Sequence, residues 1–265
     1  MRGRKIELAE NQVKKCIDFA VKFITNDKSD LDFGNSSLPR GKIDRIADCA
    51  EGKIGELAFK LFAKEFDVEI DMDFELIHGR LKIDDGQDIK RVKHRDRYIQ
   101  PKLKVDVKTS RFGSKWLLVE DHKYGEEWAD AYVFITVNLA PNIESDLESL
   151  CKRVDCIVHG YCYAGDLVDK NGEAFFQYDS QSKNRLLRYD IAKKLIQDAE
   201  GTGNEALSRK GIERAFKQSL AKNEISRNKL FMGPRLKCPS QKGIPVAMLR
   251  NRDADFDSIF SALVS

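Results

Sequence analysis

The chain has 265 residues, of which 42% are hydrophobic and 34% are charged, and its formal net charge at pH 7 is only +3. This composition is typical of a globular protein with a charged surface, and it excludes an intrinsically disordered chain. No apolar run approaches the roughly 20 residues that a bilayer span needs, and the basic start turns acidic too soon for a signal peptide. We therefore expect a cytoplasmic protein whose six cysteines remain thiols.

The first part of the chain is predicted to form two helices. Apolar residues recur at helical spacing over 6–25 and 43–66, with a polar connection over 26–42. Alternating apolar patterns then predict a series of strands, at residues 68–83, 103–109, 116–120, 131–139 and 156–163. Helical patterns return in the charged later sequence, at 189–199 and 210–222, and the tail over 230–250 is expected to be irregular because of its glycines and prolines.

The order of helices, strands and helices indicates an α/β (α+β) fold in which a central mixed sheet is flanked by helices. The length suits a single domain over residues 1–265. Its core is expected at about 43–200, preceded by an N-terminal helix and linker over 1–42. Residues 201–265 are expected to form a mostly helical C-terminal extension.

The most informative segment is the predicted strand at 103–109. Its alternation places Val105 and Val107 on one face, and Asp106 and Lys108 side by side on the other. Several acid-x-Lys triplets are expected by chance in a chain this charged, but the Asp106-Val107-Lys108 triplet is the one inside an apolar alternating run. The other interpretation of this triplet is an exposed ion pair on an edge strand.

Two further acids are candidates to join this pair. Asp88 follows a glycine turn and precedes an apolar residue, so it is placed to meet Asp106 across neighbouring strands and bind one Mg²⁺ ion. Asp84 and Asp85 in the same turn are alternatives to Asp88.

A third acid is expected from the helix over 43–66. Glu56 lies at the edge of its apolar stripe and Glu51 lies near the middle, so either acid is placed to reach toward the sheet. The other interpretation is that these residues are ordinary solvated helix glutamates.

The order of Gly-Glu on a helix, Gly-x-Asp, and Asp-Val-Lys on a strand resembles the PD-(D/E)XK nuclease superfamily, which includes most type II restriction endonucleases. The matching motifs span residues 51–116. The resemblance implies a restriction-endonuclease-like core and Mg²⁺-dependent hydrolysis of DNA phosphodiester bonds, leaving a 5′-phosphate and a 3′-OH. It implies one or two Mg²⁺ ions bound by Asp88 and Asp106, a catalytic Lys108, and assistance from Glu56. The chain departs from the family at Gln87, where the family has proline, which keeps the neighbouring aspartates open as alternatives.

Basic residues surround the proposed site and are expected to neutralise DNA phosphates. The alternative for the segment between the two aspartates is a solvated basic loop. The candidate DNA-binding residues are Lys90, Arg91, Lys93, Arg95, Arg97, Lys104, Ser110, Arg111 and Lys115.

The sequence thus predicts a type II restriction enzyme that cuts a specific site in double-stranded DNA. A homodimer and a companion DNA methyltransferase in the host are expected partners. The alternatives are a DNA repair, junction-resolving or anti-phage nuclease of the same superfamily, and a DNA-binding module that does not cleave. Zinc is not expected, because the spacing of Cys151, Cys156, His159 and Cys162 does not match a zinc knuckle.

Overall fold

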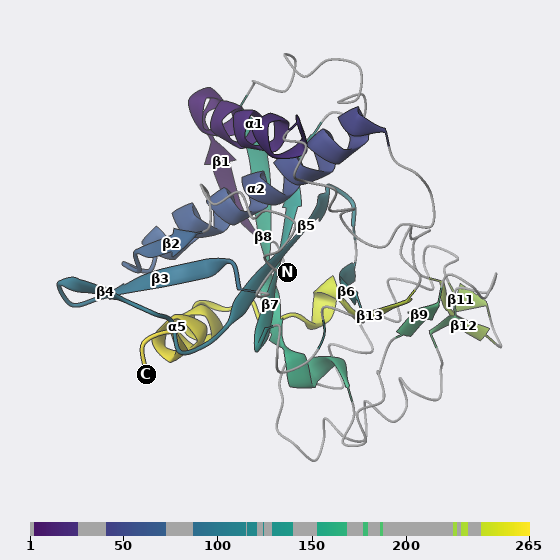
Figure 1. Ribbon diagram of the computed structural model, residues 1–265. Coiled ribbons are helices and arrows are strands. Elements are labelled where there is room, and N and C mark those ends of the chain that lie inside the picture. Colours follow the sequence, from purple (N-terminus) through teal and green to yellow (C-terminus); the bar gives the residue numbers. More distant parts are fainter. Residues whose placement is uncertain are drawn as a thin grey trace.

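A mixed sheet flanked by helices forms the centre of this α/β protein (Figure 1). The computed structural model describes residues 3–25, 41–72, 87–114, 116–120, 124, 129–139, 153–168, 177–179, 186–187, 225–226, 229–232 and 240–265. Within these ranges the central sheet has the order β1-β8-β7-β5, with β5 and β7 parallel and the other pairs antiparallel. Its strands are β1 (Arg4–Leu8), β8 (Val154–Tyr163), β7 (Ala131–Val137) and β5 (Val105–Arg111).

Three smaller sheets surround the central one. The first has the order β2-β3-β4, the second β6-β13-β9, and the third β10-β12-β11. Their strands are β2 (Ile70–Met72), β3 (Ile89–His94), β4 (Arg97–Ile99), β6 (Trp116–Glu120), β13 (Ser240–Pro245), β9 (Gln177–Asp179), β10 (Leu186–Leu187), β12 (Lys229–Met232) and β11 (Ile225–Ser226). Short 3-10 turns, η4 (Ala164–Leu167) and η6 (Val246–Met248), lie after β8 and β13.

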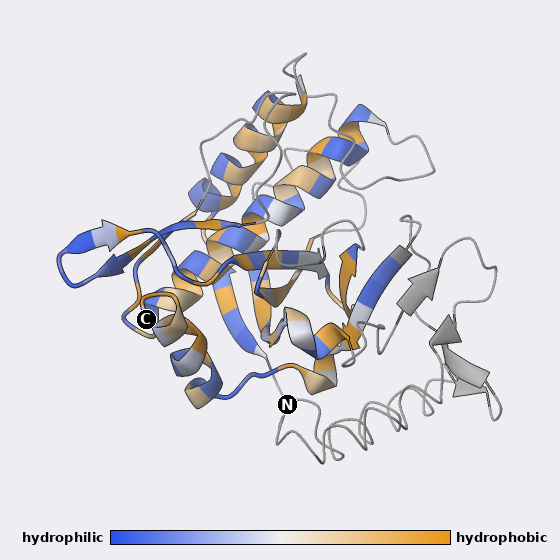
Figure 2. Cartoon of the chain, turned by 60° about the horizontal axis from the view of Figure 1, so that its bottom comes forward, coloured by the Kyte–Doolittle hydropathy of each residue, from blue (hydrophilic) through white to orange (hydrophobic). Residues whose placement is uncertain are grey.

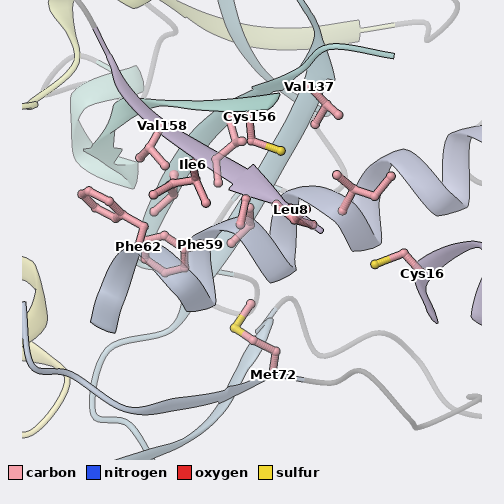
Figure 3. Packing of buried hydrophobic residues seen from close by; sticks show 14 of the residues in the cluster. Ile6, Leu8, Cys16, Phe59, Phe62, Met72, Val137, Cys156 and Val158 are labelled. Atoms are coloured by element: carbon pink, nitrogen blue, oxygen red, sulfur yellow. The ribbon is translucent and has the colours of Figure 1, made fainter. Parts of the chain in front are cut away.

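Two helices, α1 (Glu10–Thr25) and α2 (Lys42–Lys64), cover one face of the central sheet. The main hydrophobic core lies between them and the sheet. Figure 3 shows Ile6 and Leu8 of β1 beside Phe59 and Phe62 of α2 in this core. The C-terminal helix α5 (Asp253–Ala262) adds aromatic rings to it, with the Phe256 ring centroid 4.6 Å from that of Phe62.

A second core cluster covers the opposite face of the sheet. Tyr132 and Phe134 of β7 pack there against Trp116 and Leu117 of β6 and Ile244 of β13. The central sheet is therefore covered on both sides, and this decides how much of the candidate site is exposed.

The predicted helix over 6–25 is wrong at its beginning. Residues Arg4–Leu8 form strand β1, which pairs antiparallel with β8, and α1 begins only at Glu10. The sequence is ambiguous here because Ile6 fits the helical spacing that follows it as well as the alternation that buries Ile6 and Leu8. The side chain of Gln12 accepts a hydrogen bond from the Ala9 backbone N–H at 2.8 Å, at the start of the helix.

The irregular tail predicted over 230–250 is also wrong. Strand β13 occupies Ser240–Pro245 and pairs with both β6 and β9, and β12 covers Lys229–Met232. In the sequence, Gly243 indicates a loop. In the structure it lets β13 pack closely against Leu118 of β6, because a Cβ built on it would lie 2.9 Å from a methyl carbon of Leu118.

The expected second helix and four of the expected strands agree with the structure. The expected second helix and the strands over 103–109, 116–120, 131–139 and 156–163 correspond to α2, β5, β6, β7 and β8. Of the strand expected over 68–83, only Ile70–Met72 is described. The predicted helices over 189–199 and 210–222 lie outside the described residues. In the described part of the chain, none of the helices has the length and apolar character needed to cross a bilayer.

Candidate active site

Strand β5 places Asp106 and Lys108 together on the face opposite α2. Val105 and Val107 point toward the helices and are buried, as the alternation predicts. The Lys108 ammonium Nζ lies 2.5 Å from Asp106 Oδ2, and the two side chains are only 19% and 12% exposed. The pair is therefore not the exposed surface ion pair considered as an alternative, because the second core cluster covers this face of the sheet.

Asp88 lies against the free edge of β5, just before β3 begins. Its backbone N–H donates to the carbonyl oxygen of Val105 at 3.0 Å, and its carboxylate Oδ2 accepts from the Val107 N–H at 2.6 Å. The carboxylate thus takes the place of a neighbouring strand's carbonyl group. This arrangement holds Asp88 beside Asp106, although Asp88 precedes β3 and Asp106 lies in β5.

Glu56 reaches the site from α2, where it is 7% exposed. The helix lies close to β5 because Gly55 has no side chain. A Cβ built on Gly55 would lie 2.0 Å from Thr109 Oγ1 and 3.0 Å from Thr109 Cβ. The contact between Gly55 and Thr109 therefore sets the distance from which Glu56 approaches the sheet.

Gly55→Ala is expected to destabilise the protein by about 1–3 kcal/mol, because the added methyl group must push α2 away from β5. Gly52→Ala on the same helix is the matched control. In the described part of the chain, no atom outside the backbone of α2 and the neighbouring residues lies within 4 Å of a Cβ built at Gly52, so alanine there is expected to stabilise by roughly 0.5–1 kcal/mol. Urea unfolding of both variants measures the difference, and equal effects at the two positions would contradict this account of the packing.

The structure distinguishes the two helix acids that the sequence left open. Glu51 Oε2 accepts from Arg111 Nε at 3.2 Å, on the strand face turned toward α2. Glu56 instead acts electrostatically on Asp88. Glu56 is therefore the helix acid whose charge acts on Asp88.

The carboxylates crowd one another at Asp88. Burial raises the pKa of Asp88 well above its usual range, and the negative charges of Glu56 and then Asp106 raise it further. The charge of Lys53 and the hydrogen bond from the Val107 N–H act in the opposite direction without cancelling the rise. Carboxylate oxygens are the ligands that Mg²⁺ prefers, and a divalent cation bound by them would relieve the crowding.

Lys53 is a member of the site that the sequence did not predict. Its Nζ lies 2.8 Å from Glu56 Oε1 and 2.7 Å from Oε2. Lys53 and Glu56 are three residues apart and share one face of α2. Burial acts to lower the pKa of Lys53, but attraction to Glu56 and Asp88 outweighs it and raises the pKa. The spacing of three between Lys53 and Glu56 is the signal that identifies the pair in a helix.

Lys108 also has more than one acidic neighbour. Burial would lower its pKa, but Asp106, then Asp88 and the more weakly acting Glu120 of β6 raise it. Among the described residues, no three His, Cys, Asp or Glu side chains are arranged to hold an ion as they lie. The ammonium groups of Lys53 and Lys108 contact the Glu56 and Asp106 carboxylates, so an incoming cation would compete with them.

The basic segment between the aspartates forms a hairpin, made of β3 and β4. Figure 1 shows it projecting from the body, and Figure 2 shows that it is largely hydrophilic. Two of its predicted DNA-binding residues are paired with acids near or in β2. Arg91 Nη2 lies 2.5 Å from Asp71 Oδ2, and Lys93 Nζ lies 2.8 Å from Glu69 Oε1. These pairs brace the hairpin and reduce its positive charge.

The remaining predicted DNA-binding residues are spread over several positions. Lys90 is partly exposed on β3, while Arg95 and Arg97 are exposed at the end of the hairpin. Lys104 lies just before β5, and its backbone N–H donates to Asp130 at 2.7 Å. Arg111 pairs with Glu51, and the Oγ atoms of Ser110 and Ser114 are 2.6 Å apart. Lys115, Asp84 and Asp85 lie outside the described residues.

The cysteine and histidine residues of β8 lie apart from this site. Cys156 belongs to the core on the helix side of the sheet, and Cys162 belongs to the core on the other side. His159 Nε2 lies 2.8 Å from Thr136 Oγ1. The two thiols thus point to opposite faces of the sheet.

Comparisons of the chain with protein-family models, with curated proteins and with solved structures found no significant match. What bears on function is therefore the chemistry of the residues that the fold gathers at the edge of β5. These are the carboxylates of Glu56, Asp88 and Asp106 and the ammonium groups of Lys53 and Lys108.

Proposed function

We propose that this chain is a Mg²⁺-dependent endonuclease of the PD-(D/E)XK type that acts on double-stranded DNA, most simply as a type II restriction enzyme. The observation that carries the proposal is the position of Asp88. Its carboxylate accepts a hydrogen bond from Val107, the residue between Asp106 and Lys108, at 2.6 Å. Two aspartates and a lysine are thereby gathered at one strand edge, an arrangement suited to metal-assisted cleavage of a phosphodiester bond.

The order of elements around the site supports a restriction-endonuclease-like core. Helix α2 supplies Glu56, the hairpin that follows begins at Asp88, and β5 carries Asp106 and Lys108. The next strand of the central sheet, β7, then runs parallel to β5. The resemblance drawn from the sequence implies a mixed sheet of this kind, flanked by helices.

Asp88 and Asp106 would hold the Mg²⁺ ion, with Glu56 beside them. When bound, the ion would lower the pKa of a coordinated water and offset negative charge on the scissile phosphate. The raised pKa of Lys108 keeps its side chain protonated at neutral pH. Lys108 is therefore suited to donate hydrogen bonds to the attacking water or to a phosphate oxygen.

The β3–β4 hairpin provides a route for DNA to reach the site. It leads directly away from Asp88, and no carboxylate of the described residues pairs with its exposed arginines, Arg95 and Arg97. These side chains are suited to contact phosphates or guanine edges. A homodimer on a palindromic site and a companion methyltransferase are part of this proposal.

The first experiment is incubation of the purified chain with unmethylated phage-sized DNA, in Mg²⁺ or in EDTA, followed by gel analysis. We expect discrete fragments that appear only with Mg²⁺ and that carry 5′-phosphates. A smear would show cleavage at many sites, and would favour a repair, junction-resolving or effector nuclease over a site-specific enzyme. Intact DNA in Mg²⁺ and in Mn²⁺, combined with DNA binding, would overturn the nuclease proposal in favour of a binding module.

A further inference from the structure

The Lys53 ammonium group is held inside the carboxylate cluster and not at its surface. It contacts both oxygens of Glu56, at 2.8 and 2.7 Å, and its side chain is only 16% exposed. On another side it lies 5.2 Å from the centre of the Phe19 ring, which favours a cation. Its charge also acts on Asp88. A positive charge is therefore already fixed at the helix side of the cluster.

The oxygens that remain are enough for one ion. In the described chain, the polar contacts of the two aspartate side chains use Oδ2 of Asp88, toward Val107, and Oδ2 of Asp106, toward Lys108. One further oxygen remains on each aspartate. Both oxygens of Glu56 contact Lys53. A second divalent ion would need Glu56 as a ligand, and Lys53 competes for that carboxylate.

The net charge of the site also indicates one bound ion. Three carboxylates (Glu56, Asp88 and Asp106) face two ammonium groups (Lys53 and Lys108), and Glu120 acts on Lys108 more weakly than either aspartate. One divalent ion together with one scissile phosphate would bring this set to neutrality. A second ion would leave it with two positive charges in a largely buried place, which is costly.

We propose that Lys53 serves as a fixed cation in the place of a second metal, so that this site binds one divalent ion per chain. The inference rests on the proposed metal site and adds its stoichiometry. Lys53 is a positioning residue, because it acts through Glu56 and through the charge of the cluster. Loss of Lys53 removes the ammonium group that competes for both Glu56 oxygens and opens a second ion position.

The experiment is titration of the full-length protein with Mn²⁺ alone, in which free Mn²⁺ is counted by electron paramagnetic resonance. We expect one bound ion in the wild type and two in Lys53→Met. Lys53→Arg retains the charge and is expected to bind one. Lys60→Met is the matched control and is also expected to bind one ion. Lys60 lies on the same helix, and its Nζ is 3.6 Å from Asp71 Oδ1.

Lys53→Met leaves Glu56 without its ammonium partner, so a second variant guards against a folding defect. The double variant Lys53→Met/Glu56→Gln removes both charges of the pair. We expect it to bind one ion, because the Glu56 carboxylate that would hold the second ion is gone. Two ions in the wild type, or one ion in well-folded Lys53→Met, would overturn the role of Lys53 and leave the nuclease proposal standing. No ion bound by the wild type would instead remove the metal site itself, and the inference with it.

Discussion

Asp88→Asn is expected to abolish Mg²⁺-dependent cleavage and at the same time to raise the thermal stability of the metal-free protein. The variant removes a metal ligand, and loss of a group on which the reaction depends reduces cleavage by roughly 10³-fold or more. It also removes a carboxylate whose pKa is raised by burial, by Glu56 and by Asp106. An asparagine oxygen still accepts the hydrogen bond from Val107, so the strand edge is retained.

The stability effect has a defined dependence on pH. Because the pKa of Asp88 is higher in the folded chain than the unfolded value of about 3.9, the folded state holds the proton more tightly. The contribution of Asp88 to the free energy of unfolding is therefore full below the unfolded pKa and is lost as pH rises through the raised folded pKa. Asp88→Asn lacks this decline, so its advantage over the wild type grows toward neutral pH.

Thermal unfolding of both proteins over a range of pH, with and without Mg²⁺, measures these effects. Mg²⁺ is expected to stabilise the wild type more as pH rises, because the ion binds the deprotonated carboxylate, and to stabilise Asp88→Asn little. A variant that is less stable than the wild type at neutral pH, or that still cleaves DNA, would contradict the role given to Asp88.

Asp255→Asn is the matched control. Burial alone would raise the pKa of Asp255, but hydrogen bonds from the Arg252 side chain and from the backbone N–H groups of Arg252 and Asn251 hold it below its usual range. The contribution of Asp255 to stability therefore depends on pH with the opposite sign to that of Asp88. The variant is expected to lose stability at neutral pH, and to keep both cleavage and the response to Mg²⁺.

Lys108→Met is expected to reduce cleavage by roughly 10²–10³-fold, because the variant removes a positive hydrogen-bond donor from the position where charge develops. It also leaves Asp106 without its ion-pair partner in a place that is only 12% exposed. Breaking a buried pair in this way costs about 3 kcal/mol. Mg²⁺ is expected to recover part of this stability, since it replaces the missing positive charge beside Asp106, but it cannot restore the donor.

Single-turnover cleavage and urea unfolding in the presence and absence of Mg²⁺ test this prediction. Lys5→Met is the control, because Lys5 Nζ lies 2.8 Å from Asp155 Oδ2 in a pair of the same kind on β1 and β8 of the same sheet. The Lys5 side chain is 61% exposed, so its loss is expected to change neither cleavage nor stability appreciably. Full cleavage by Lys108→Met would exclude this lysine from the reaction.

Local sequence was sufficient to predict the parts of the site that lie within one element. The alternation that places Asp106 beside Lys108 depends only on the two-residue period of a strand, so it was readable at once. The same applies to the second helix and to the strands with long apolar runs. The pair formed by Lys53 and Glu56 was also readable in principle, because residues three apart share one face of a helix.

Other features were decided only by contacts between distant segments. Ile6 fits a helix and a strand equally well, and pairing with β8 selects the strand. The strand β13 exists because β6 lies beside it, although its glycine and proline suggest a loop. In both cases the partner strand supplies the hydrogen bonds that local propensity does not.

The residues of the site were likewise predicted in part from local sequence and decided in part by tertiary contacts. The sequence predicted that Asp88, Asp106 and Lys108 belong together, but left open which helix acid joins them. Packing made that choice, because the missing side chain of Gly55 lets α2 lie against β5, and from there the charge of Glu56 acts on Asp88. Burial and the pKa shifts that it causes depend on the layers covering both faces of the sheet, and no local pattern of residues contains that information.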